Sequence, residues 1–269
     1  MPLTVMTYNI RSGGRGRLDA ITRVILMQRP DILALQELRG FDDDGGRPVR
    51  RLAEDIGLHP FLARSRFGQP VAVLVRNPAS VRSARSVRRP FHHAAERVVM
   101  DTDRGRLTVT GTHLCPYSSR RRRSEARWLA AGIVPTDMTL VMGDLNTLDP
   151  WADHTDRLRH LPEQFRSRHL MGQRGREVDT RAIQVLAAAG LVDLFHSAHP
   201  GGRMEEGEKD YTAPTMHGGG REFSFMRLDY ILGSPPVAML TRACRVVSGG
   251  ETEYASDHYP VVAALDLDG

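Results

Sequence analysis

Short apolar runs alternate along this chain with amphipathic stretches, and glycine or proline separates many of them. Residues 4–10 form the first run, which is β-branched and apolar and predicts a strand that ends in a glycine-rich loop. Apolar residues then recur at helical spacing from Leu18 until Pro30, and residues 31–37 form a second apolar strand that ends on a carboxylate. This order of strand, helix and strand predicts a βαβ-like unit, whose strand ends commonly hold α/β active sites.

The later apolar patterns predict more strands than helices. Short helices are indicated near Leu52, after Arg123 and near Leu186. No clear internal repeat or flexible linker divides the chain, so we expect residues 1–269 to form one domain. Further strands are predicted at residues 71–75, 97–101, 107–114, 140–146 and 261–265, with a hairpin between the second and the third.

One long polar stretch interrupts this pattern from Pro150 to Val178. It is irregular, contains several histidines and arginines, and exceeds the length of a typical connection. Long surface loops often carry function because the rigid elements around them hold them in position. We therefore expect a substrate loop or a mobile flap in this stretch.

The run at residues 140–146 stops on Asp144 and Asn146. Side chains two residues apart on a strand point to the same face, so this carboxylate and this carboxamide aim at one point. Gly143 leaves room for another group to approach the backbone. One acceptor beside one donor suits a reaction in which a nucleophile loses a proton while an oxyanion grows. The structural alternative is a strand end whose Asp and Asn merely start a turn.

Polar residues recur at the ends of the other apolar runs. Any one of them could have a structural role, and a lone histidine more often has one. Six polar positions of this kind are hard to explain by packing alone, so together they predict an active site. With Asp144 and Asn146 as one of the six, the others in chain order are Asn9, Glu37, His113, Asp229, and Asp257 with His258.

The composition is that of a globular protein without a membrane span. Apolar residues make up 41% of the chain and charged residues 26%, and no apolar run is long enough to cross a bilayer. The first residues lack a basic and then apolar signal segment, so we expect a cytoplasmic protein, and we expect it to be a monomer. Cys115 and Cys244 are too few for a disulfide framework or a four-thiolate zinc site.

The formal net charge of +5 favours phosphate-bearing partners, nucleic acid among them, through long-range attraction. However, Lys209 is the only lysine, and such one-sided use of arginine can reflect genome composition instead of selection for a basic surface. The densest charge run, residues 120–123, precedes a helical pattern. We interpret the run as a solvated helix face, with a phosphate-steering patch beside His113 as the alternative.

The six polar positions lie in motifs that resemble those of a known family. In chain order the motifs are Thr7-Tyr8-Asn9-Ile10, Leu35-Gln36-Glu37, Thr112-His113-Leu114, Gly143-Asp144-Leu145-Asn146, Arg227-Leu228-Asp229-Tyr230-Ile231-Leu232 and Ser256-Asp257-His258-Tyr259-Pro260-Val261. The ordered set resembles the endonuclease/exonuclease/phosphatase superfamily, which includes deoxyribonucleases, sphingomyelinases, inositol-polyphosphate phosphatases and deadenylases. The resemblance implies an α+β fold, a four-layer αββα sandwich in which two packed, mostly antiparallel sheets are flanked by helices.

The resemblance also implies a metal site. Glu37 would be the main ligand of a divalent cation, with Asn9 and Asp257 close to the ion directly or through water. Oxygen ligands of this kind suit Mg²⁺ or Mn²⁺ better than zinc. Arg39 matches an arginine of deoxyribonuclease-like members and would bind a neighbouring phosphate, unless it is only a surface residue.

For the reaction itself, the resemblance implies that Asp144 orients and deprotonates the attacking water. Asn146 would steady the phosphoryl oxygens. His258, paired with Asp229, would hold a phosphate oxygen and concentrate positive charge on the transition state. His113 would protonate the leaving alkoxide or lie beside the group that does.

These residues together predict hydrolysis of a phosphoester bond, which needs neutralised oxygens, an in-line water and a stabilised leaving group. We expect a metal-dependent phosphodiesterase, acting on nucleic acid or on a smaller diester. A phosphomonoesterase for a sugar-, inositol- or nucleotide-like metabolite is the alternative. A catalytically inactive binding module is disfavoured because none of the six positions holds an inert residue. Residues 112–114 differ from the pattern of abasic-site endonucleases, which disfavours DNA repair of that kind.

Overall fold

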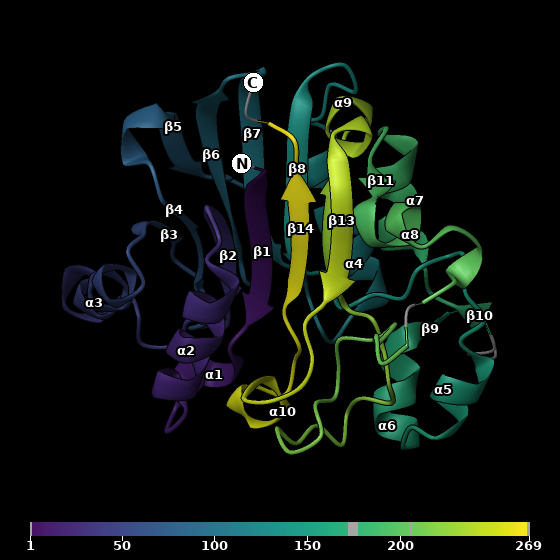
Figure 1. Ribbon diagram of the computed structural model, residues 1–269. Helices are drawn as coiled ribbons and strands as arrows, with labels where there is room; N and C mark the ends of the chain where they lie inside the picture. The colour runs from purple at the N-terminus through teal and green to yellow at the C-terminus, as the bar shows by residue number, and fades with distance from the viewer. Residues whose placement is uncertain (1, 172–176, 205, 268–269) are drawn as a thin grey trace.

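The computed structural model describes residues 2–171, 177–204 and 206–267. Within these ranges, two six-stranded sheets pack face to face and helices cover their outer faces (Figure 1). The predicted αββα sandwich is therefore confirmed. None of the helices in these ranges has both the length and the apolar character that a membrane span requires.

The first sheet joins strands from the two ends of the sequence. The two strands of the predicted βαβ-like unit pair in parallel, and all other neighbours in this sheet pair antiparallel. In spatial order the strands are β13 (Thr241–Val246), β14 (Val261–Leu265), β1 (Leu3–Asn9), β2 (Ile32–Gln36), β4 (Val71–Val75) and β3 (His59–Ala63).

The second sheet comes mainly from the middle of the sequence and contains the predicted hairpin, β6 (Ala94–Thr102) and β7 (Gly105–His113). One of its pairs, β7 with β8 (Met138–Asp144), is parallel, and the others are antiparallel. In spatial order the strands are β11 (Val192–Asp193), β12 (Asp229–Gly233), β8, β7, β6 and β5 (Val81–Ser86).

Helices form the outer layers. The helices α2 (Leu18–Gln28) and α3 (Arg47–Asp55) pack on the first sheet, whereas α4 (Ser119–Ala130) and α7 (Arg181–Ala188) pack on the second. The shorter α-helices are α1 (Arg11–Gly14), α5 (Thr155–Arg159), α6 (Glu163–Arg166), α8 (Leu194–Ala198), α9 (Pro235–Met239) and α10 (Thr252–Ala255). The remaining elements are the 3-10 helices η1 (Asp43–Gly45), η2 (Pro78–Ser80), η3 (Ser167–His169) and η4 (Pro200–Gly202) and the ribbon of β9 (Leu170–Met171) and β10 (Glu177–Val178).

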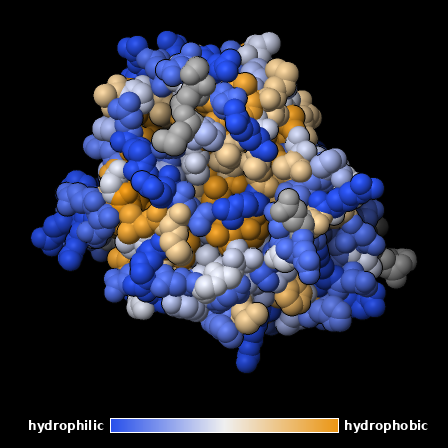
Figure 2. Space-filling view, in the orientation of Figure 1, coloured by the Kyte–Doolittle hydropathy of each residue, from blue (hydrophilic) through white to orange (hydrophobic). Residues whose placement is uncertain are grey.

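Alternation along the strands divides the apolar side chains between the layers. Val5 of β1 points into the core between the sheets, where it joins Met142 of β8 in one buried cluster. The next residue, Met6, points to the other face and packs in the cluster that includes Ile21 of α2. Over β1 and β14 of the first sheet, Figure 2 shows apolar residues at the centre of a largely hydrophilic surface.

Strand direction brings the predicted polar positions to one edge of the sandwich. The parallel pairs β1/β2 and β7/β8 end at this edge, which is the lower one in Figure 1. Because β14 runs antiparallel to β1 and β12 antiparallel to β8, the residues at their starts reach the same edge. The residues gathered there are Asn9, Glu37, His113, Asp144, Asp229, Asp257 and His258.

The stretch from Pro150 to Val178 differs from the prediction of an irregular loop. It contains α5, α6, η3 and β9, and Leu158 and Leu161 of this stretch are buried against Leu148, Met226 and neighbouring residues in a small apolar cluster. Residues 172–176 of the predicted flap lie outside the described residues. The sequence looked irregular because the apolar residues of this segment are few and each helix is short.

The interpretation of residues 120–123 as a solvated helix face is correct for some of these residues and wrong for one. These arginines lie on α4, and Arg120 is exposed. Arg122, however, is fully buried, and its guanidinium donates hydrogen bonds to the backbone oxygens of Cys115, at 3.1 Å, and Arg168. A buried guanidinium requires such acceptors, and two other segments of the chain supply them.

Candidate active site

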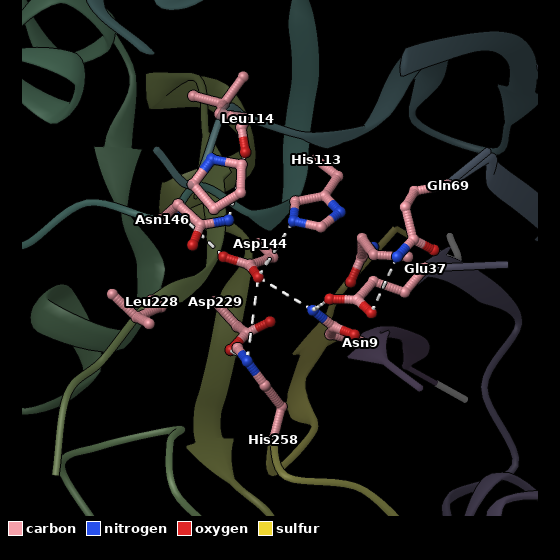
Figure 3. A network of polar contacts seen from close by, with 12 residues as sticks. Asn9, Glu37, Gln69, His113, Leu114, Asp144, Asn146, Leu228, Asp229 and His258 are labelled. Atoms are coloured by element: carbon pink, nitrogen blue, oxygen red, sulfur yellow. Dashed lines mark hydrogen bonds and ion pairs between the residues drawn. The ribbon is translucent and has the colours of Figure 1, made fainter. Parts of the chain in front are cut away.

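Asp144 lies at the centre of the site, where side chains from both sheets converge (Figure 3). Its Oδ1 atom accepts a hydrogen bond from the backbone N–H of Asn146 at 2.8 Å, and its Oδ2 atom accepts one from Nδ2 of Asn9 at 3.0 Å. Nε2 of His113 lies 3.4 Å from Oδ2, and Nε2 of His258 lies 4.0 Å from the same atom. The buried carboxylate is therefore held by neighbours on several sides.

The register of the second sheet explains this convergence. Asp144 on β8 lies opposite His113 on β7 and opposite Asp229 on β12. Gly143 has a φ of 147°, and a Cβ atom at this position would lie 1.9 Å from the backbone oxygen of Thr112. Only glycine allows β8 to approach β7 in this way, so Gly143 fixes the position of the aspartate that follows it.

Asp229 and His258 form a buried charge pair. Oδ2 of Asp229 lies 2.7 Å from Nδ1 of His258. Burial on its own lowers the pKa of His258, but the hydrogen bond and negative charge of Asp229, together with the charge of Asp144, hold that pKa well above its ordinary value. His258 is therefore an imidazolium at neutral pH. Its Nε2–H is too far from Asp144 for a hydrogen bond and can be donated to another acceptor.

The environment of Asp144 makes it a better proton acceptor than an exposed aspartate. Burial and the negative charge of Asp229 raise the pKa of Asp144 to about 7. The positive charge of His258 and the hydrogen bonds from Asn146 and Asn9 act in the opposite direction. The carboxyl group thus takes up a proton much more readily than it would in water.

Glu37 follows β2 with a φ of 59°, a conformation that is uncommon for residues other than glycine. Its Oε2 atom accepts a hydrogen bond from the backbone N–H of Ser12 at 2.8 Å, and its Oε1 atom accepts one from Nδ2 of Asn9 at 3.2 Å. The amide nitrogen of Asn9 therefore links the carboxylates of Glu37 and Asp144. The amide oxygen of Asn9 accepts from the N–H of Arg11 at 3.0 Å.

Asp257 is a further buried carboxylate in the same region. Its Oδ2 atom lies 3.2 Å from Nε of Arg11, and its Oδ1 atom accepts a hydrogen bond from Oγ of Ser256 at 3.3 Å. Burial raises the pKa of Asp257, and the charge of Glu37 adds to this rise although His258 and Arg11 oppose it. A carboxylate whose charge is disfavoured by burial and by a neighbouring carboxylate lies in an environment that attracts a cation.

His113 is buried and neutral. Burial and then the positive charge of His258 lower the pKa of His113 to about 3. The ring of His93 stacks on the ring of His113, with centroids 4.1 Å apart and planes inclined by 25°. The carboxylate of Asp144 lies 3.4 Å from Nε2 of His113, so it can orient this imidazole from one side.

Asn146 and Arg39 occupy different positions relative to this network. Asn146 is buried with a φ of 49°, and its Nδ2 atom donates a hydrogen bond to the backbone oxygen of Leu114 at 3.2 Å. Arg39 has an exposed side chain, and its backbone N–H donates to the backbone oxygen of Glu37 at 2.8 Å. The structure thus brings Asn146 into contact with Asp144 and leaves the Arg39 side chain at the surface.

Two groups of side chains in the site are candidates for holding a metal ion. Asp144, Asp229 and His258 offer ligand atoms that all lie within 4.8 Å of one another, and this buried group could bind a metal ion. In it, however, the proton on His258 already compensates the negative charge, and an imidazolium is not a ligand. Glu37 and Asp257 instead present carboxylate oxygens, which are the donors that Mg²⁺ prefers.

The site also contains residues that the sequence patterns did not identify. Arg11 and Ser12 contact Asp257 and Glu37, and their place directly after the Asn9 motif is the signal that could have found them. Gln69 lies in the loop before β4, and its Nε2 atom is 3.5 Å from Oε2 of Glu37. Gln69 could not be found in this way, because it precedes an apolar run and belongs to none of the family motifs.

The fold and the site define a phosphoesterase of the endonuclease/exonuclease/phosphatase superfamily. The chain belongs to the Endonuclease/Exonuclease/phosphatase family, whose family model matches residues 6–258. The family assignment that the motifs imply is therefore confirmed. Members of this family are metal-dependent hydrolases that act on phosphoester bonds.

Solved structures with the same fold cover nearly the whole chain. An AP endonuclease from Archaeoglobus fulgidus matches with a TM-score of 0.71 at 19% identity, over 98% of this chain and 99% of its own. The 3′ phosphatase NExo (D146N) from Neisseria, bound to a product DNA hairpin, matches with a TM-score of 0.69 at 21% identity, over 98% and 99%. ANGEL2, a 2′,3′-cyclic phosphatase, matches with a TM-score of 0.67 at 18% identity, over 99% and 96%. At these identities the likeness establishes the fold alone. No curated protein sequence matches the chain significantly.

Proposed function

We propose that the protein is a divalent-cation-dependent phosphodiesterase, of nuclease type, in which Asp144 takes the proton from the attacking water. The observation that carries the proposal is the setting of this carboxylate, which accepts hydrogen bonds from Asn9 and Asn146 and has a raised pKa. A general base works best when its pKa lies near the operating pH. The hydrolytic chemistry of the family on phosphoester bonds supports the same conclusion.

In this proposal Glu37 and Asp257 hold the cation, and Mg²⁺ or Mn²⁺ fits their oxygen atoms. The raised pKa of Asp257, to which the charge of Glu37 contributes, supports this assignment because a bound cation would offset the negative charge that these carboxylates bring to the site. When bound, the cation would neutralise charge on the phosphoryl oxygens. The amide nitrogen of Asn9 would fix the Glu37 carboxylate by donating to its Oε1 atom, and the amide oxygen of Asn9, which accepts one hydrogen bond from Arg11, has a second lone pair that could face the ion.

His258 donates its Nε2–H to a phosphoryl oxygen in the proposed mechanism. Its pairing with Asp229 keeps it protonated, so it brings a fixed positive charge next to the reacting group. Such a charge stabilises the transition state most effectively in a buried site, where water does not screen it. Asp229 is then a positioning residue that acts through His258.

We propose that His113 holds Asp144 in position as a neutral imidazole. Its lowered pKa argues against a role as the acid that protonates the leaving group, because a neutral imidazole has a single N–H, which in this scheme faces Asp144. Asn146 would steady a phosphoryl oxygen with the N–H that its bond to the oxygen of Leu114 leaves available. The leaving alkoxide would take its proton from water in this scheme.

We further propose nucleic acid as the phosphodiester substrate and residues 1–269 as one domain. The net charge of +5 supports a polyanionic partner, and Arg39 would contact a neighbouring phosphate. A solved structure of the same fold contains a product DNA hairpin, which is consistent with this substrate class. The buried cluster between the sheets, which contains residues of both, supports one domain.

Paired assays of the purified protein with a model phosphodiester and a model phosphomonoester, each in Mg²⁺ and in excess chelator, test the proposal. We expect turnover of the diester in Mg²⁺ and none in chelator. Preferential turnover of the monoester would replace the phosphodiesterase by the alternative phosphomonoesterase. Absence of turnover with either ester, across a range of divalent cations, would contradict an enzymatic function.

Glu37→Gln tests the metal assignment, with Glu54→Gln as the control at an exposed position on α3. Because the amide keeps the shape of Glu37 but removes its charge, we expect the Mg²⁺ concentration for half-maximal turnover to rise at least about tenfold. The control should behave as the wild type. An unchanged Mg²⁺ dependence in Glu37→Gln would show that the cation binds elsewhere in the site.

A further inference from the structure

A ladder of aromatic rings leads from the active site to the surface. It begins at His113, on which His93 stacks, and it continues to His92, whose centroid lies 4.6 Å from that of His93 in an edge contact. Phe67 stacks on His92 with centroids 4.6 Å apart and planes inclined by 19°. Tyr117 contacts His92 edge-on at 5.4 Å. Phe67, His92 and Tyr117 are called the aromatic platform below.

The aromatic platform is open to solvent. Phe67 is 53% exposed and Tyr117 is 61% exposed, so a large part of each side chain remains accessible although Phe67 stacks on His92 and Arg168 lies over Tyr117. The guanidinium of Arg168 lies 5.2 Å from the centre of the Tyr117 ring, which adds a positive charge to the same surface. Exposed aromatic rings that cluster beside an active site, with arginine among them, are typical of a binding surface.

Two buried charged residues of α4 fix the loops of His92 and Tyr117, which carry part of this surface. Glu125 is fully buried, and its carboxylate accepts hydrogen bonds from the backbone N–H groups of His92, at 2.5 Å, and Cys115, at 2.8 Å. Arg122, also fully buried, donates to the backbone oxygens of Cys115 and Arg168. One helix thus anchors the loops of His92 and Tyr117 and the segment of Arg168. A surface held in this way loses little conformational freedom when a ligand binds.

We propose that the aromatic platform stacks with the unpaired bases of a single-stranded nucleic acid whose scissile phosphate lies at Asp144. The proposal rests on the phosphodiesterase function proposed above and specifies its substrate class. The ladder starts at His113, which contacts Asp144, so a strand bound with a phosphate in the site passes over the platform with the adjacent nucleotides. Bases of a single strand offer free faces, whereas bases within a duplex are already stacked on their neighbours.

If the strand binds by stacking, its affinity depends on the presence of bases, whereas binding by charge alone does not require them. Each base stacked on an aromatic side chain contributes about 5- to 150-fold to affinity, and this contribution varies little with sequence because every base has a π-face. Phosphate contacts contribute equally with and without bases. A strand that keeps its phosphates but lacks its bases therefore separates the platform from simple electrostatic attraction.

The test measures fluorescence anisotropy with labelled oligothymidylate, labelled oligouridylate and an abasic oligonucleotide of the same length. All proteins carry Asp144→Asn, and chelator is present, so that no probe is cleaved. We expect the protein to bind both base-containing probes at least about fivefold more tightly than the abasic probe. Adding Phe67→Ala or Tyr117→Ala should remove this preference, and Phe67→Tyr should retain it. Met239→Ala on α9, at the opposite end of β12 from Asp229, is the matched control for loss of an exposed apolar side chain.

The platform is supported if the protein binds the DNA or the RNA probe more tightly than the abasic probe, and if this preference is lost in Phe67→Ala and in Tyr117→Ala. Met239→Ala should keep the preference. Equal affinity for base-containing and abasic probes overturns it, and so does a base preference that survives both alanine substitutions. These outcomes do not depend on turnover. If the wild type hydrolyses a small diester with Mg²⁺ but binds bases no better than the abasic strand, only the platform is contradicted. If it hydrolyses no phosphoester, the proposed function itself is contradicted.

Discussion

Replacing Asp144 with Asn removes the proposed proton acceptor while it keeps nearly the same side-chain shape. Loss of a general base typically lowers the rate about 10²–10⁴-fold, so we expect kcat to fall by this amount. The structure shows a second effect. Both oxygens of Asp144 accept hydrogen bonds, one from the N–H of Asn146 and the other from Nδ2 of Asn9. In either orientation, the amide of the variant turns an N–H toward one of these donors.

Two opposing effects determine the stability of Asp144→Asn, namely an unpaired hydrogen-bond donor and the loss of a buried charge. The buried donor left without its acceptor costs roughly 1–3 kcal/mol. Against this, the shift of the pKa from 3.8 to about 7 means that the charged carboxylate destabilises the metal-free fold, by an amount on the order of 4 kcal/mol well above pH 7. The net gain is on the order of 2 kcal/mol, which corresponds to about 4 °C in Tm for a chain of this length.

The stability difference between Asp144→Asn and the wild type should depend on pH. The folded-state pKa of Asp144 is raised above its unfolded value, so the proton stabilises the fold below the unfolded pKa. This stabilisation is lost as the pH rises through the folded-state pKa. Asn carries no such proton. The variant should therefore gain most over the wild type near about pH 8 and lose its advantage near about pH 4.

Single-turnover kinetics with Mg²⁺ and thermal unfolding in chelator measure the two effects separately. Asp55→Asn, at an exposed position on α3, is the control for loss of a carboxylate outside the site. A variant that keeps kcat within about tenfold of the wild type would exclude Asp144 as the base. A variant that is less stable than the wild type at both pH values would show that the charge of Asp144 is not destabilising.

Three other substitutions or additions have defined outcomes. His258→Ala should lower kcat about 10²–10³-fold, because it removes the fixed positive charge; single-turnover rates close to those of the wild type would contradict this. Arg227→Met should destabilise the fold by about 3–5 kcal/mol in chemical unfolding, because it leaves the buried carboxylates of Asp149 and Asp193 unpaired; a loss under about 1 kcal/mol would count against it. Mg²⁺ at about 100 times its Kd should stabilise the wild type by about 2.7 kcal/mol and raise Tm, and chelator should reverse the rise.

The apolar pattern was sufficient to predict most strands and the polar residues at their ends, whereas the layers of the fold were predicted from the resemblance to the family. Strands such as β4 and β8 are continuous apolar runs because both of their faces are covered, and such runs are visible without a structure. The site residues could be found for a related reason. A carboxylate at the end of an apolar run, such as Glu37 or Asp144, has no packing role that would explain its position.

The remaining features depend on contacts between distant parts of the chain. Arg122 belongs to a run of four arginines and looks like its neighbours, yet the oxygens of Cys115 and Arg168 make it a buried residue. The helices between Pro150 and Val178 are short and become stable only through the cluster around Leu148 and Met226. Local periodicity contains no information about such partners, so these features appear only in three dimensions.

The close approach at Gly143 has a consequence for how mutational data on this protein should be read. In a saturation mutagenesis experiment scored by activity, Gly143 should tolerate substitution as poorly as Asp144, because any side chain would collide with the backbone of Thr112 and displace the aspartate. Its intolerance would look like that of a residue in contact with substrate. In such an experiment, some of the positions least tolerant of substitution would therefore be those that keep β7 and β8 in register, and not only those that take part in the reaction.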